Sequence, residues 1–143
     1  MTSENPFIED CDYRQVLVLR KDLKMRAGKL AAQAAHASMA RLTKAAGVRV
    51  QVSQSGQREL VIPLNADLEA WVTGRFKKIC VYVPGEAELL ELFERVKAAG
   101  LDAHLVQDAG LTEFGGIPTH TFISIGPHPK AVLDPYTGHL PLY

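Results

Sequence analysis

The chain has 143 residues, of which 47% are apolar and 22% charged, and its basic and acidic side chains balance to a formal net charge of zero. This length and composition are typical of one globular domain with a substantial core, whereas a domain that coats nucleic acid is usually basic overall. No apolar run approaches the ~20 residues of a membrane span, and the acidic, polar N-terminus does not resemble a signal peptide.

The first predicted elements are a strand, a cation-rich loop and a helix. A run of β-branched and aliphatic residues predicts a strand over 15–20, and an alanine-rich segment predicts a helix over 27–46. On that helix Lys29, Gln33 and His36 share one face, while the opposite face is small and apolar and suits packing on a sheet. Ligands usually bind at the carboxyl edge of an open α/β sheet, so we expect the binding site here.

The rest of the chain alternates strands with helices. Alternating valines and a turn signal predict an exposed hairpin, inserted at about residues 48–64. Further strands are predicted over 78–83, 102–106 and 119–125, and further helices over 65–71, 86–99 and 129–133. This pattern predicts a three-layer α/β/α sandwich with a four-stranded mixed, mostly parallel sheet. We expect residues 14–143 to form a single domain after an N-terminal lead-in over 1–13.

The sequence matches no common motif for a cofactor or a metal. Gly28-Lys29 resembles the end of a phosphate-binding loop, but Leu30 replaces the hydroxyl residue that should follow. The five histidines have no metal-ligand spacing, and Cys11 and Cys80 are isolated. We therefore predict neither a cofactor nor a metal, and reduced thiols in a cytoplasmic protein.

Three segments in order and register carry a family resemblance. They are Leu19-Arg-Lys-Asp-Leu-Lys-Met-Arg-Ala-Gly-Lys-Leu-Ala-Ala-Gln-Ala-Ala-His-Ala37, then Gln107-Asp-Ala-Gly-Leu-Thr-Glu113 leading to Ile125-Gly-Pro127, and Thr137-Gly-His-Leu140. Together they resemble the type 2 peptidyl-tRNA hydrolase family over residues 15–46 and 77–143. The resemblance implies a homodimer that acts on peptidyl-tRNA, hydrolysing the ester between a peptide, or an N-blocked amino acid, and the 3′ ribose of tRNA.

Such a reaction needs a positioned water, a proton acceptor and a group that stabilises the developing oxyanion. Asp108 is expected to orient or deprotonate the water and Lys29 to stabilise negative charge, with Thr112 as a donor and His36 as a substitute base. The residues expected to bind RNA are mostly cations that would meet phosphates: Lys21, Lys24, Arg26, Gln33 and Thr119.

Each candidate also has an ordinary structural explanation. Asp108 before Ala-Gly could be a turn residue that bonds its own backbone, and a lysine at a helix start is often a solvated surface group. Leu111 and Glu113 stand where the family usually has Arg and Gln. They favour an alternative, a non-catalytic family member that binds RNA or a protein partner on the same surface. A third possibility is hydrolysis of another acyl ester or amide.

Overall fold

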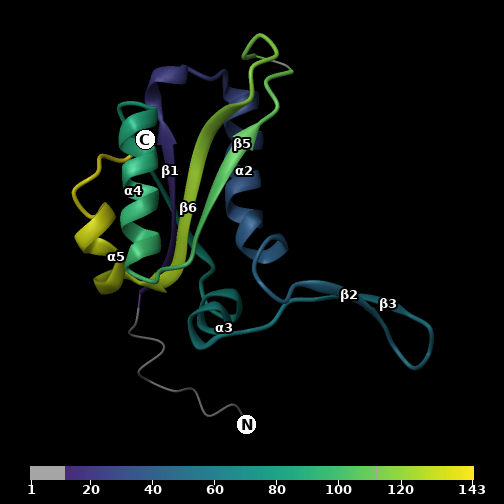
Figure 1. Cartoon of the computed structure of the whole chain (residues 1–143). Coiled ribbons are helices and arrows are strands. Elements are labelled where there is room, and N and C mark those ends of the chain that lie inside the picture. The colour runs from purple at the N-terminus through teal and green to yellow at the C-terminus, as the bar shows by residue number, and fades with distance from the viewer. Residues whose placement is uncertain (1–11, 112) are drawn as a thin grey trace.

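The computed structural model describes residues 12–111 and 113–143, and its centre is a four-stranded sheet (Figure 1). The strands, in spatial order, are β4 (Lys77–Val83), β1 (Tyr13–Arg20), β6 (Thr119–Pro129) and β5 (Ala103–Asp108). β1 and β4 are parallel, with Leu19 opposite Tyr82. β6 is antiparallel to both of its neighbours.

The α/β class and the four-stranded mixed sheet are confirmed, but the expectation that the sheet is mostly parallel is wrong. β1, β4 and β5 run in one direction, yet β6 lies between β1 and β5 and runs the opposite way, so two of the three pairings are antiparallel. The reason is the connection from β5 to β6. A parallel pair needs a crossover of a dozen or more residues, usually helical, and the described residues of 109–118 form no helix.

Helices cover both faces of the sheet, so the predicted three layers are present. α4 (Glu86–Ala98) and α5 (Lys130–Thr137) lie on one face, where Val18, Val81, Leu89 and Ile123 belong to one buried cluster. On the other face, α2 (Ala27–Thr43) packs mainly on β5 and β6, through a second cluster that contains Leu19, Ala37 and Phe122. The short 3-10 helix η1 (Lys21–Leu23) joins β1 to this layer.

The predicted short helix and the predicted hairpin are both present, the helix as α3 (Ala66–Thr73). The side chain of Asn65 caps α3 by accepting the N–H of Leu68 at 2.8 Å. The predicted hairpin consists of β2 (Arg49–Val52) and β3 (Arg58–Val61), which extend away from the sheet with almost wholly exposed side chains (Figure 1).

Two other predictions concern the whole chain. Within the described part of it, no helix is both long and apolar enough to cross a bilayer. Cys80 is a free thiol on β4, half-buried, and its burial raises the thiol pKa. Cys11 and the predicted lead-in, apart from Asp12 and Tyr13, lie outside the described residues.

A buried serine in β6 provides a test of how polar groups are accommodated in the core. Ser124 is fully buried, and its hydroxyl has no hydrogen-bond partner among the described residues. Ser124→Ala is expected to raise the free energy of unfolding by up to about 1 kcal/mol, because it removes a polar group that is desolvated without compensation. Urea denaturation measures the change.

The matched control is Thr121→Val on the same strand. Thr121 is equally buried, but its hydroxyl donates to Gln33 Oε1 at 2.6 Å. Its loss leaves that oxygen unpaired and is expected to cost about 1–3 kcal/mol. Equal destabilisation by both changes would contradict the assignment of Ser124 as an unsatisfied group.

Candidate functional site

Asp108 ends β5 at the end of the sheet where α2 begins. The N–H of Gly110 donates to Asp108 Oδ2 at 2.8 Å. Gly110 has a φ of +82°, and a Cβ there would lie 2.2 Å from the carbonyl oxygen of Ile117, so only glycine fits this turn. The segment Asp-Ala-Gly therefore folds as a turn that fixes the carboxylate. Asp108 is thus a turn residue that bonds its own backbone, the ordinary structural role that the sequence allowed for it.

The same carboxylate also receives two side chains from α2. Lys29, in the first turn of the helix, places its Nζ 2.8 Å from Asp108 Oδ1, and Gln33 donates from Nε2 to this oxygen at 3.2 Å. Because Thr121 of β6 donates to the Gln33 carbonyl oxygen, the amide is held with its NH₂ group toward Asp108. Asp108 is thus a turn residue and also the centre of a side-chain network.

This network concentrates charge at a largely buried position. The side chains of Lys29 and Asp108 are only 13% and 14% exposed. The hydrogen bond from Lys29 holds the pKa of Asp108 below its usual value, with a further contribution from the Gly110 N–H, while burial acts in the opposite direction. An ammonium group in such a partly dehydrated site can stabilise negative charge that develops on a reacting oxygen.

The structure places the other predicted catalytic residues differently. His36 lies on the exposed side of α2, and its charge is the smallest of the influences that lower the pKa of Asp108. The apolar face of α2 packs on the sheet as expected, with Ala37 in the buried cluster, but Gln33 is not on the face turned away from the sheet: it is buried against it. Thr119 pairs directly with Asp108 across β5 and β6. Thr112 lies outside the described residues.

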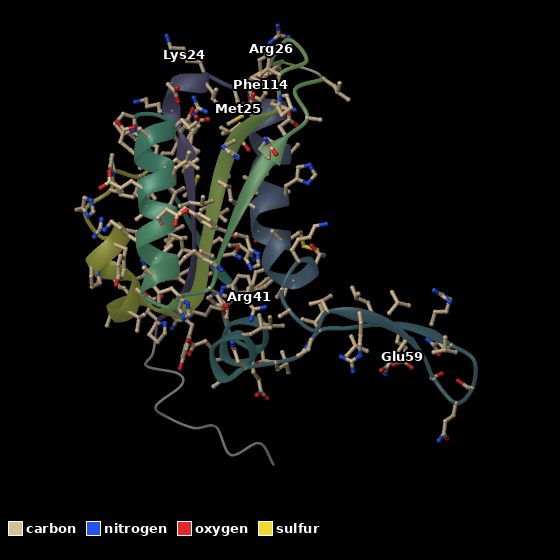
Figure 2. All side chains as sticks on the ribbon, viewed as in Figure 1. Lys24, Met25, Arg26, Arg41, Glu59 and Phe114 are labelled. Carbon is tan, nitrogen blue, oxygen red and sulfur yellow. The ribbon has the colours of Figure 1, made fainter. Side chains whose placement is uncertain are left out.

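The predicted cationic loop lies at the same end of the domain. Figure 2 shows Lys24 and Arg26 there beside Met25 and Phe114, far from Glu59 on the hairpin. Met25 is buried in the cluster under α2 and anchors the loop, while Lys21, Lys24 and Arg26 are exposed. Exposed cations beside a buried charge pair make this end of the domain suitable for an anionic ligand.

Two residues of the site were missed by sequence reasoning. Thr121 orients Gln33, and the centre of the Phe114 ring lies 5.6 Å from Lys29 Nζ. Thr121 could have been found because it is a polar residue within the apolar strand predicted over 119–125. Nothing in the sequence distinguishes Phe114 from the other residues of its loop. Of the two residues that depart from the family pattern, Leu111 is 85% exposed and Glu113 is half-buried.

Within residues 12–111 and 113–143, His, Cys, Asp and Glu side chains form no group of three that could hold a metal ion.

Comparisons with known proteins agree on one family. A family model described as Peptidyl-tRNA hydrolase PTH2 matches residues 13–143. A peptidyl-tRNA hydrolase of Methanopyrus kandleri is 42% identical over 130 residues, covering 91% of this chain and 97% of that protein. One from Thermococcus onnurineus is 37% identical, with coverages of 91% and 97%. The bovine protein named mitochondrial peptidyl-tRNA hydrolase 2 is 36% identical, covering 94% of this chain and 66% of its own length.

A solved structure is similar in fold alone. It is a protein of unknown function from Agrobacterium tumefaciens, with a TM-score of 0.53 and 9% sequence identity, and the match covers 92% of this chain and 98% of that one.

Proposed function

The chain belongs to the peptidyl-tRNA hydrolase PTH2 family, and from this premise we propose that it hydrolyses the ester between a peptide, or an N-blocked amino acid, and the 3′ ribose of tRNA. The observation that carries the proposal is the ion pair of Lys29 with Asp108, 2.8 Å apart and mostly buried, inside the segment that matches the family. Cleavage adds water across the acyl–oxygen bond: the ribose oxygen takes up one proton and is released as a hydroxyl, and the peptide leaves as a carboxylate whose proton passes to solvent.

Lys29 is proposed to act on the transition state. When water attacks the ester carbonyl, the carbonyl oxygen takes up negative charge, and a fixed ammonium group in a partly dehydrated site stabilises that charge more than free water does. The ion pair with Asp108 holds Nζ in place before substrate arrives. Preorganisation of this kind lowers the barrier, because no solvent has to reorient during the reaction.

Asp108 is proposed to orient the attacking water and Lys29, rather than to act as a strong base. Its lowered pKa makes it a weak proton acceptor at neutral pH. Both carboxylate oxygens already accept hydrogen bonds, from Lys29 and Gln33 on one side and from Gly110 on the other. Oδ1 thereby uses both of its lone-pair sites, whereas Oδ2 keeps one, so the carboxylate can still accept a hydrogen bond from water through Oδ2.

The exposed loop cations are proposed to bind tRNA phosphates. Lys24→Asn and Arg26→Gln should each make the salt dependence of tRNA affinity shallower by about one unit, since each phosphate contact releases about one counterion. Asn suits position 24 because this residue has a φ of +51°. Affinity measured over a range of salt concentrations gives the slope.

The control for these variants is Lys97→Gln, which neutralises an exposed cation of α4 on the opposite face of the sheet. Its slope should match that of the unmodified protein. If Lys97→Gln changes the slope as much as Lys24→Asn does, the RNA does not lie preferentially on the loop.

The activity itself is tested with N-acetyl-aminoacyl-tRNA and free aminoacyl-tRNA as paired substrates for the purified protein. We expect release from the N-blocked substrate and little from the free one. Metal independence is part of the proposal, so the rate should be unchanged after dialysis against a chelator. Binding of tRNA without hydrolysis of either substrate would favour the non-catalytic alternative.

Two further expectations stay predictions. A homodimer is expected from the family and can be measured by light scattering. A cytoplasmic location is expected from the composition, although the bovine relative is named mitochondrial. Fractionation of the source cell tests whether the protein is found in the cytoplasm.

A further inference from the structure

The face of β4 that lies on the same side as α2 is partly open. α2 packs mainly on β5 and β6 at the other edge of the sheet. Along β4, Val81 and Val83 are buried under α4, whereas Cys80 and Tyr82, which alternate with them, are only half-buried. Within residues 12–111 and 113–143, a strip of the sheet beside α2 is therefore left partly uncovered.

Two tyrosines and a lysine gather on this strip. Lys21 Nζ lies 4.4 Å from the centre of the Tyr82 ring, and the Tyr143 ring meets Tyr82 edge-on, at 5.9 Å between centroids and an interplanar angle of 82°. Tyr143 is 54% exposed. Residues 141–143 are fixed along β4, because Tyr82 donates its N–H to Pro141 at 3.2 Å and Tyr143 donates its N–H to Cys80 at 3.1 Å. The Tyr143 ring is thus exposed and also held in a defined orientation.

This aromatic group lies on the same face of the sheet as the Lys29–Asp108 pair. Four residues lie side by side across the sheet, one on each strand: Tyr82, Leu19, Phe122 and Val106. All four belong to the cluster that α2 covers in part. Asp108 follows two residues after Val106. With adjacent strands ~4.8 Å apart and ~3.3 Å per residue along a strand, the distance from Tyr82 to Asp108 is about 16 Å. A few nucleotides of an extended single strand can cover this span.

We propose that Tyr143, supported by Tyr82, stacks against a base upstream of the terminal adenosine in the single-stranded 3′ end of the substrate tRNA, while Lys21 contacts a neighbouring phosphate. The inference rests on the proposed function and names where the substrate RNA lies. An exposed aromatic ring beside a cation is how proteins hold single-stranded nucleic acid without reading its sequence. Lys21 also joins the group to Lys24 and Arg26, so the aromatic surface and the cationic loop can follow one backbone.

The test compares Tyr143→Ala with the unmodified protein on two substrates: N-acetyl-aminoacyl-tRNA and N-acetyl-aminoacyl-adenosine, which has no upstream base. For the tRNA substrate we expect KM to rise about tenfold with kcat unchanged, since truncating a stacking ring commonly has this effect on affinity. For the adenosine substrate neither constant should change. Tyr143→Phe should behave as the unmodified protein, because stacking does not need the hydroxyl.

Leu142→Ala is the matched control. Leu142 is the neighbouring exposed residue, but it pairs with Val81 and faces a cavity lined by Val81 and Leu133, on the side of the sheet covered by α4 and α5. It should leave both substrates unaffected. Equal KM values for Tyr143→Ala and the unmodified protein on tRNA, or an equal rise on the adenosine substrate, would overturn the inference.

A binding arm separates this inference from the proposed function. Affinity for a single-stranded oligonucleotide with the sequence of the tRNA 3′ end is measured by fluorescence anisotropy for the same variants, and needs no hydrolysis. If the unmodified protein hydrolyses neither substrate, the proposed function fails, while a tenfold weaker oligonucleotide affinity for Tyr143→Ala still supports the stacking site. No difference in this affinity would overturn the stacking site alone.

Discussion

Replacing Asp108 by asparagine is expected to lower kcat for N-acetyl-aminoacyl-tRNA by ~10²-fold or more, the usual range for loss of a group that handles the reacting water. The amide has nearly the shape of the carboxylate but lacks its charge, so Lys29 loses its counterion and the water loses its strongest acceptor. KM should change little, since Asp108 is a poor partner for a phosphate. Steady-state kinetics on folded protein measures both constants.

The pH dependence of the free energy of unfolding tests whether Asp108→Asn loses stability because it breaks the ion pair with Lys29. The pKa of Asp108 is lower in the folded protein than its ordinary value of 3.8, so the pair stabilises the fold above that value. This contribution is lost as the pH falls through the lower, folded pKa. Asp108→Asn should therefore be less stable than the unmodified protein at pH 7, and the difference should shrink below about pH 4. A difference that is constant with pH would contradict the ion pair.

Replacing Lys29 by methionine is expected to lower kcat by ~10²–10³-fold, comparable to the loss of a single oxyanion donor. Methionine keeps most of the apolar stem and removes the charge. If the charge acts only in the transition state, kcat and kcat/KM fall together and more substrate does not restore the rate. Pre-steady-state measurement at saturating enzyme separates the chemical step from product release.

The matched control for this variant is Lys44→Met, which removes an exposed lysine just past the other end of α2. It should leave kcat within about a factor of two of the unmodified rate, because substitutions of exposed residues away from a site are roughly neutral. An effect of Lys29→Met that appears only in KM would make Lys29 a binding residue rather than a catalytic one.

Most elements of the fold could be predicted because their signals are local. The aliphatic run of β1, the Asn65 cap of α3 and the alternating valines of the hairpin each depend on a few neighbouring residues. Strand order is not local. The placement of β6 between β1 and β5 depends on which faces can be buried together, and a sequence that alternates strands and helices does not specify it.

The site could be predicted in part for a similar reason. The spacing of Lys29 and Gln33 correctly places both on one face of α2, but periodicity alone does not say whether that face meets solvent or sheet. Gln33 could be buried because Thr121 and Asp108 satisfy its amide, and these partners are distant in sequence. The same helix leaves His36 exposed, so a residue at similar helical spacing has a different environment.

The most direct measurement of the central claim is a single-turnover time course of N-acetyl-aminoacyl release from tRNA, with enzyme in excess, for the unmodified protein and Lys29→Met. Equal tRNA binding by the two proteins is established first. The proposed function predicts complete release by the unmodified protein and a rate at least ~10²-fold slower for the variant. Equal rates for the two proteins, or tRNA binding without release by either, would contradict it.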